Sequence, residues 1–142
     1  MKRATPYLFF PGHTEEAFAF YGSVFGGDEP RILRNRDMGM DGPDGDLVAH
    51  VSLRIADETS LMGSDVAGPQ QDDHRIGTNV EIHLSPDDAD EARRVFAALA
   101  EGGTIAMPLE RTSWSELFGG CVDRYGVRWI VDFEGSVQFG AP

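Results

Sequence analysis

Residues 79–103 read NVEIHLSPDDADEARRVFAALAEGG, and this stretch decides the fold. Apolar and polar residues alternate over 79–84, which predicts a strand with one buried face. Ser85 and Pro86 predict an N-cap and a first helical residue, because serine caps helices and proline needs no hydrogen-bonded N–H there. The glycines at 102–103 predict the end of the helix. Its apolar face consists of Ala89, Ala92, Val95, Phe96 and Leu99.

The remaining elements repeat the order strand, helix, strand, strand, strand in both halves of the chain. In the first half, Thr14 predicts a helix N-cap, and Gly26 and Gly27 end the helix. Strands are expected at 7–10, 31–36, 47–55 and 60–64, with a loop at 37–46, and in the second half at 104–109, 120–123 and 127–133. Because this order occurs twice, the sequence predicts an α+β fold of two βαβββ modules.

The polar segment 65–77 is rich in Gly, Pro, Gln and Asp and is expected to link the two modules. We therefore predict one domain over 1–142, with module one at about 1–66, module two at about 77–134 and a tail at 135–142. Each helix is expected to cover the outer face of its sheet. The two inner faces would then form a cupped mixed sheet around a small-molecule cavity between the modules.

The composition limits the possible function classes. Twenty-four acidic residues against 12 basic ones give a formal net charge of -12, which disfavours nucleic acid and anionic membrane surfaces as partners. No apolar run approaches the roughly 20 residues that cross a bilayer, and the N-terminus has no signal-peptide pattern. Cys121 is the single cysteine, so no intramolecular disulfide can form. We expect a cytoplasmic protein.

Residues on the strand faces that point away from the helices are the candidates for a site. Their mixture of polar and aromatic side chains is typical of a pocket that orients a small ligand with a few polar groups. These residues are Thr5, Tyr7, Phe9, His50, Ser52, Arg54, Asn79, Glu81, His83, Arg128, Ile130 and Asp132.

His50 is a candidate catalytic residue, because imidazole titrates near neutral pH and can act as an acid, a base or a metal ligand. The alternative is a strand histidine that is hydrogen-bonded to backbone or solvent. Glu81 and His83 are two residues apart and share a strand face, where they could hold a divalent cation or share a proton. Glu81 is therefore the second catalytic candidate. An exposed polar stripe explains the same pair equally well.

Trp114 lies in a predicted loop, where its ring either closes over a ligand or fills the core. Cys121 has no adjacent basic residue, so we expect a small core residue instead of a nucleophile. The ligand-binding candidates are aromatic and polar residues from both halves. They are Tyr7, Phe9, His50, Arg54, Trp114 and Phe118, with Glu81 as a further polar contact.

Several stretches of the chain together are typical of one protein family: TPYLFF (5–10), EEAF (15–18), FGG (25–27), AHVSLRI (49–55), LMGSD (61–65), GG (102–103), MPL (107–109), TSW (112–114) and DRYGVRW (123–129). With these stretches, the chain resembles the PhnB-like branch of the vicinal oxygen chelate superfamily, which includes glyoxalases, bleomycin-resistance proteins and extradiol dioxygenases. The resemblance covers nearly the whole chain. It implies paired βαβββ modules in a glyoxalase-like fold, frequent assembly as a homodimer, and a cavity on the concave sheet face.

The resemblance also implies where a metal would bind in metal-dependent members, which use four His, Gln or Glu ligands. The matching positions in this chain are Thr5, about Met62, Glu81 and about Ile130, of which only Glu81 is a good ligand. The usual metal centre is therefore expected to be absent, or rebuilt from His50 and His83. Some relatives carry a demethylubiquinone methyltransferase label, which we do not adopt, because no glycine-rich strand-turn-helix for a nucleotide-like methyl donor is present.

The function predicted is binding of a small organic ligand between the modules without the usual metal centre. No cofactor is predicted, although a divalent metal is possible. One alternative is a divalent-metal-dependent lyase or isomerase of the glyoxalase type. In it, Glu81 with His50 or His83 binds the metal, and one histidine or carboxylate is the base. If the protein is an enzyme, we expect the glyoxalase, lyase or dioxygenase type. The other alternative is a dimeric, non-catalytic interaction module. The expected partners are a small-molecule ligand and a second copy of the chain.

Overall fold

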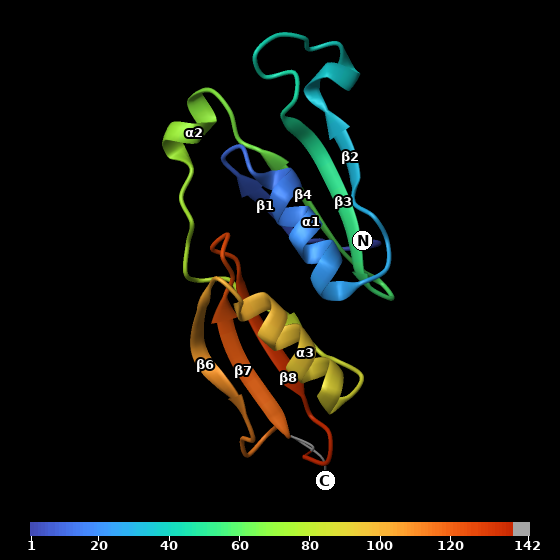
Figure 1. Ribbon diagram of the computed structural model, residues 1–142, viewed down its shortest axis with the longest axis vertical. Helices are drawn as coiled ribbons and strands as arrows, with labels where there is room; N and C mark the ends of the chain where they lie inside the picture. Colours follow the sequence, from blue (N-terminus) through green and yellow to red (C-terminus); the bar gives the residue numbers. More distant parts are fainter. Residues whose placement is uncertain (138–142) are drawn as a thin grey trace. The chain divides into compact units, whose positions relative to one another are not determined.

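The computed structural model describes residues 1–137, and the chain divides into two compact units, Met1–Arg75 and Ile76–Pro142. Each unit has its own four-stranded sheet and its own long helix (Figure 1). In the first unit the elements are β1 (Tyr7–Phe10), α1 (Thr14–Phe25), β2 (Arg31–Arg34), the 3-10 helix η1 (Asn35–Met38), β3 (Val48–Ala56), β4 (Thr59–Asp65) and α2 (Pro69–Asp73). In the second unit they are β5 (Ile82–Leu84), α3 (Ala89–Ala100), β6 (Thr104–Glu110), β7 (Leu117–Val122) and β8 (Arg128–Phe133).

The two sheets have the same topology. The strand orders are β1-β4-β3-β2 and β5-β8-β7-β6. In each sheet the first strand runs parallel to the last, and the other neighbours are antiparallel. A hairpin cannot connect two parallel strands. In each sheet, the helix and the two intervening strands therefore connect the first strand to the last. The predicted α+β fold with two βαβββ modules is therefore confirmed. The predicted tail at 135–142 lies mostly outside the described residues, which end at 137.

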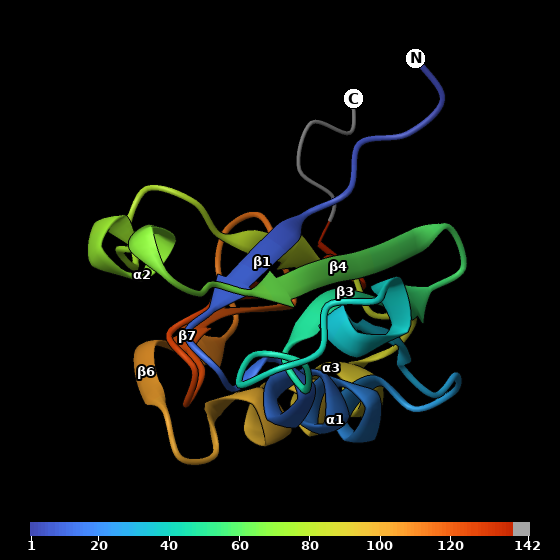
Figure 2. The same cartoon turned by 90° about the horizontal axis from the view of Figure 1, so that it is seen from above.

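α1 covers one face of the first sheet, and its packing leaves the other face open (Figure 2). Phe18 and Tyr21 of α1 are fully buried, and so are Leu53 and Leu61 of the strands β3 and β4 that α1 contacts. Gly63 in β4 allows this close packing, because a Cβ atom there would lie 2.7 Å from Leu8 O and 2.9 Å from Phe18 Cε2. The glycine of the MGSD stretch is thus required by the core.

α3 covers one face of the second sheet in the same manner. Leu99 on the helix and Trp129 and Val131 on β8 are fully buried. Asp123, which is 3% exposed, accepts hydrogen bonds from the backbone N–H groups of Tyr125 and Val127 and from Trp129 Nε1 at 2.8 Å. The DRYGVRW stretch therefore builds the turn between β7 and β8 and fixes the buried tryptophan.

The structure corrects both predicted helix starts. α3 begins at Ala89, because the N-cap is Asp88 instead of Ser85: the Asp88 carboxylate accepts a hydrogen bond from Glu91 N at 2.8 Å. Thr14 is the first residue of α1, and its N–H donates to Asp65 Oδ1 at 3.0 Å. A carboxylate that is distant in sequence thus replaces the predicted local cap.

The alternation predicted for 47–55 is broken at its start. Val48, expected on the polar face, is 2% exposed and belongs to the core. The cause is a register shift between Leu33 and Arg34, where β2 pairs with β3. From His50 onward the predicted faces are correct, since Val51 and Leu53 are buried.

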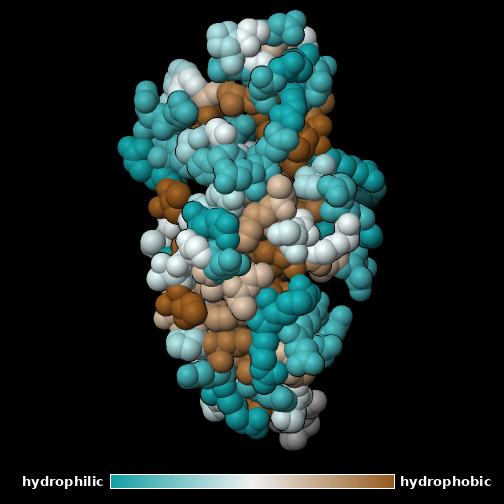
Figure 3. Space-filling view, viewed as in Figure 1, coloured by the Kyte–Doolittle hydropathy of each residue, from teal (hydrophilic) through white to brown (hydrophobic). Residues whose placement is uncertain are grey.

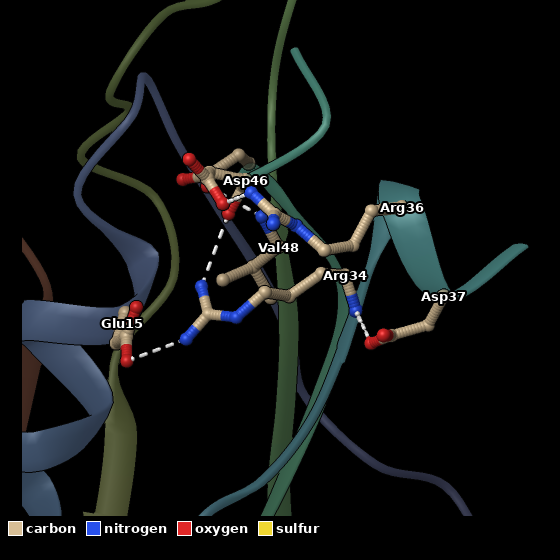
Figure 4. Close-up of polar contacts among 7 residues, drawn as sticks. Glu15, Arg34, Arg36, Asp37, Asp46 and Val48 are labelled. Atoms are coloured by element: carbon tan, nitrogen blue, oxygen red, sulfur yellow. Dashed lines mark hydrogen bonds and ion pairs between the residues drawn. The ribbon is translucent and has the colours of Figure 1, made fainter. Parts of the chain in front are cut away.

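Polar contacts hold the segment between β2 and β3, where the sequence predicts a flexible loop (Figure 4). The Arg34 guanidinium donates to Glu15 Oε1 at 2.8 Å and to the carbonyl of Asp46 at 3.0 Å, while Asp37 accepts from Arg34 N at 2.8 Å. Arg36 forms an ion pair with the Asp46 side chain. The hydrogen bond from Arg34 lowers the pKa of Glu15 below its ordinary value. These contacts connect the loop to the start of α1.

The predicted linker contains the short helix α2 and the boundary between the units, after Arg75. Hydrophilic side chains predominate on the surface seen in Figure 3, in agreement with the net charge of -12. Among residues 1–137, no helix is long and apolar enough to span a membrane.

Candidate functional site

The face of the first sheet that is not covered by α1 carries aromatic and polar side chains. Residues paired across neighbouring strands point to the same side, so the strand register defines this face. One row joins Tyr7, Met62, Ser52 and Arg31, and the next joins Phe9, Ser64, His50 and Leu33. We call these eight residues the open face of the first sheet.

Three of the predicted site residues form a cluster on this open face. The hydroxyl of Tyr7 lies 3.1 Å from His50 Nδ1, and the two ring centroids are 5.6 Å apart. The Phe9 ring lies 5.1 Å from that of Tyr7. Tyr7 is 40% exposed and Phe9 51%, a large exposure for aromatic side chains on a sheet. The cluster combines an apolar surface with an oriented imidazole.

Arg54, the fourth candidate in this unit, lies one row further along β3, opposite Ser60. Its Nε is 3.2 Å from Asp28 Oδ2, and both side chains are more than half exposed. A surface ion pair of this kind holds its members weakly. Asp28 therefore holds the Arg54 guanidinium only weakly.

The uncovered face of the second sheet carries the remaining candidates and contains two ion pairs, Glu81–Arg128 and His83–Asp132. In the first pair, Glu81 Oε1 lies 3.4 Å from Arg128 Nε. In the second, His83 is opposite Ile130 on β8, next to Gly120 on β7. The strand predicted from Asn79 begins only at Ile82, so Glu81 lies just before β5 and His83 within it, and each contacts a different partner.

His83 is paired with Asp132, a residue that the sequence placed on the same face without assigning it a role. His83 Nε2 lies 2.9 Å from Asp132 Oδ2. The other carboxylate oxygen of Asp132 accepts a short hydrogen bond from the hydroxyl of Ser115, which is fully buried. The result is a chain of three side chains, Ser115 to Asp132 to His83, that ends at an imidazole with 49% of its surface exposed.

Ser115 was missed by the sequence analysis, although a local signal for it exists. Thr112 and Ser115 are three residues apart, and the Thr112 hydroxyl accepts hydrogen bonds from the N–H groups of Trp114 and Ser115 at 3.3 and 3.1 Å. Threonine commonly closes a turn in this way. The turn places Trp114 against Phe118, with ring centroids 5.3 Å apart in an edge-to-face arrangement. Phe118 is opposite Asp132, so both rings lie beside the Ser115–Asp132–His83 chain.

The donor set does not fit the metal centre of the superfamily. Of the four matching positions only Glu81 carries a carboxylate, and it is already paired with Arg128. Throughout residues 1–137, no group of three or more His, Cys, Asp or Glu side chains is arranged to hold a metal ion. A divalent cation needs several donors to offset its dehydration. A site at Glu81 and His83 stays a prediction.

Cys121 lies on the opposite side of the second sheet, in the core. It is 2% exposed, and burial raises the pKa of its thiol to about 11, with smaller contributions from the charges of Asp123 and Glu81. A thiol with such a pKa is protonated at neutral pH and is a poor nucleophile. This agrees with the predicted core role.

Comparison with known proteins identifies the family. Residues 2–132 match the family described as 3-demethylubiquinone-9 3-methyltransferase. The chain belongs to this family. Protein YjdN of Escherichia coli (strain K12) is 30% identical over 141 residues, which cover 90% of this chain and 92% of that protein. The crystal structure of protein PA1353 from Pseudomonas aeruginosa is similar with a TM-score of 0.80 and 35% identity, covering 93% of this chain and 97% of that one.

The resemblance to the PhnB-like branch is confirmed. A PhnB protein from Bacillus cereus is 30% identical with a TM-score of 0.74, covering 92% of this chain and 98% of that one. A glyoxalase-related enzyme from Fulvimarina pelagi shares the fold at 20% identity and a TM-score of 0.52, covering 98% of this chain and 99% of the enzyme. These likenesses establish the family and the glyoxalase-like fold.

The family description names a methyl transfer, and two features of the helices bear on it. Nucleotide-like cofactors commonly bind where a glycine-rich loop opens a helix. The paired glycines of this chain follow α1 and α3 instead, at 26–27 and 102–103. The N–H groups of Thr14 in α1 and Glu91 in α3 are already bound by Asp65 and Asp88.

Proposed function

We propose that this PhnB-like protein binds a small organic ligand on the open face of the first sheet, without the usual metal centre of its superfamily. The observation that carries the proposal is the Tyr7–Phe9–His50 cluster: two exposed rings beside an imidazole whose orientation is fixed at Nδ1. Exposed aromatic side chains grouped around a few polar groups mark binding sites more often than bare surface.

The chemistry of the cluster indicates the class of ligand. Tyr7 and Phe9 provide flat apolar surfaces for a ring or an alkyl group. His50 offers its Nε2 to a polar group, and Arg54 beyond it carries a positive charge that an acidic ligand would meet. The ligand we propose is therefore a small, partly apolar compound with an oxygen-bearing or acidic end.

A screen of small aromatic and carboxylated compounds by thermal shift tests the proposal, because a ligand that binds the folded state raises the melting temperature. For each hit, we expect Phe9→Ala to weaken binding about tenfold, as the loss of one aromatic anchor costs about 1–2 kcal/mol. Met38→Ala is the matched control, since Met38 is 50% exposed on η1, outside the open face. A screen without hits, or hits that bind Phe9→Ala and His50→Gln unchanged, would contradict the proposal.

The absence of the usual metal centre is tested separately by elemental analysis of untagged protein purified without added metal. We expect far less than one equivalent of zinc, nickel, manganese or iron, because within the described residues no group of three or more His, Cys, Asp or Glu side chains is arranged to hold a metal ion. Near-stoichiometric metal that disappears in Glu81→Ala or His83→Ala would replace this proposal with the metal-dependent lyase or isomerase.

We further propose that the chain assembles as a homodimer, as its resemblance to PhnB-like proteins implies. The support is the exposed apolar surface outside the proposed ligand site, including Ile105 and Met107 on β6, the edge strand of the second sheet. A cytoplasmic location, which fits the lone cysteine, stays a prediction.

A further inference from the structure

Of the two ring nitrogens of His83, one contacts a carboxylate and the other has no hydrogen-bond partner within the described residues. Its Nε2 faces Asp132 Oδ2 at 2.9 Å. Its Nδ1 has no hydrogen-bond partner anywhere in residues 1–137, and about half of the side chain is exposed. In the neutral ring, a carboxylate at Nε2 favours the proton on that nitrogen, which leaves the lone pair on the exposed Nδ1.

The partner of this imidazole is itself held in place. Asp132 is 15% exposed, and its second oxygen accepts the hydroxyl proton of the buried Ser115. Ser115 is held in place as well, because its backbone N–H donates a hydrogen bond to the Thr112 hydroxyl. A base whose orienting carboxylate is largely shielded from solvent and hydrogen-bonded is well suited to acid–base catalysis.

The surroundings of His83 define what could bind beside it. Arg128 lies in the adjacent row of the same face and is 25% exposed. Its Nε contacts Glu81, while neither of its terminal guanidinium nitrogens has a hydrogen-bond partner within the described residues. Those two nitrogens suit a carboxylate, which guanidinium groups bind with two parallel hydrogen bonds. Trp114 and Phe118 provide an apolar wall beside Asp132.

We propose that the second unit is a metal-independent proton-transfer site for small 2-oxo carboxylates, with His83 as the catalytic base, Asp132 as a positioning residue and Arg128 as the anion-binding group. This goes beyond the proposed function, which concerns the first sheet. Nδ1 of His83 takes a proton from the carbon next to the carbonyl. The electrons of the C–H bond form the C=C bond of an enolate, and the carbonyl electrons move to its oxygen, near Arg128. Return of the proton restores the substrate or gives its isomer, so no oxidant or reductant is needed.

The first test uses the unaltered protein labelled with nitrogen-15, at a pH at which the imidazoles are neutral. The side-chain nitrogen shifts of His83 are expected to show a proton on Nε2 and none on Nδ1. In Asp132→Asn the two tautomers are expected to mix, an effect that a merely structural role of Asp132 would not produce. A wild-type ring with its proton on Nδ1, or with both tautomers equally populated, overturns the assignment.

The second test follows exchange of the carbon-bound protons of pyruvate and 2-oxobutyrate for deuterium in heavy water, by proton NMR. Wild-type protein is expected to exchange them at least a hundredfold faster than free imidazole at the same concentration, which is the lower end of what a positioned base contributes, about 10²–10⁴. His83→Gln should remove this rate, and Asp132→Asn should lower it at least tenfold. Arg128→Gln should raise the KM with a smaller effect on kcat.

His74→Gln is the matched control, because it removes a histidine that follows α2 in the other unit. Circular dichroism of every variant checks that it is folded. Exchange no faster than with free imidazole, or exchange unchanged in folded His83→Gln, overturns the proposal. Ligand binding that depends on Phe9 would survive either result, so the two proposals can fail independently.

Discussion

Cys121 and Asp123 lie two residues apart near the end of β7, and both side chains point into the core of the second unit. Asp123 is buried, and its carboxyl group accepts hydrogen bonds from three N–H donors, two in the turn and one on Trp129. Cys121 has no such donors, so burial raises the pKa of its thiol to about 11. Two neighbouring buried side chains thus differ in the hydrogen-bond donors that surround them.

The raised pKa of Cys121 predicts how stability depends on alkaline pH. Below about pH 9, the ordinary pKa of a thiol, the group is protonated in both states. Between that pH and about 11 the unfolded chain loses the proton while the folded chain keeps it, so the free energy of unfolding falls as pH rises. The expected loss is about 2–3 kcal/mol.

Chemical denaturation at several pH values from about 8 to 11 measures this dependence. Cys121→Ala lacks the thiol but keeps every other titrating group, so its free energy of unfolding should fall by less over the same range. Equal pH dependence in the two proteins would show that the thiol makes no contribution.

Packing of a helix on a sheet depends on small residues where the two approach closely. Gly63 in β4 lies under the ring of Phe18 in α1. The LMGSD stretch therefore has two structural roles. Its glycine allows α1 to pack closely on the sheet, and the Asp65 carboxylate accepts hydrogen bonds from the first N–H of α1 and from the N–H of Val48. Neither task involves a ligand.

Gly63→Ala is expected to destabilise the protein by about 1–3 kcal/mol, because the added methyl group meets both Leu8 O and the Phe18 ring. Gly120→Ala in β7 is the control, since a Cβ atom there has its nearest neighbour, Trp129 O, at 3.6 Å, an ordinary contact. Its effect should stay below about 1 kcal/mol. Urea denaturation of both variants makes the comparison. Similar losses at the two positions would contradict the packing argument.

At the scale of the whole molecule, the chain consists of two units with one topology and different side chains on their uncovered sheet faces. The first unit has exposed aromatic rings beside His50, and the second has the Glu81–Arg128 ion pair and the Ser115–Asp132–His83 chain. The same backbone architecture therefore supports a binding proposal in one unit and a proton-transfer proposal in the other.

A homodimer is the assembly that we expect in solution. Light scattering coupled to size exclusion should give a mass of about 31 kDa, twice the 15.5 kDa of one chain. Because each chain carries a net charge of -12, we expect dissociation on dilution to be greater at low salt than at high salt. A mass near that of a single chain at all concentrations would exclude the dimer.

The sequence by itself determined the two βαβββ modules, the approximate positions of their strands and helices, and the core roles of Cys121 and the apolar helix faces. These features follow from local periodicity, glycine pairs and composition, all of which can be read along the chain. The strand faces of His50 and His83 were predictable for the same reason, since side chains alternate along a strand.

Only the tertiary structure decided which side chains meet. Asp65 at the start of α1, Asp132 at His83 and Ser115 at Asp132 pair residues that lie 51, 49 and 17 positions apart. Strand register sets these pairings, and register depends on bulges such as the one beside Val48, which no local pattern encodes. The sequence pattern therefore identifies a polar residue on a strand face as a candidate site residue. The partner of that residue, which decides its chemistry, depends on how strands that are distant in sequence align.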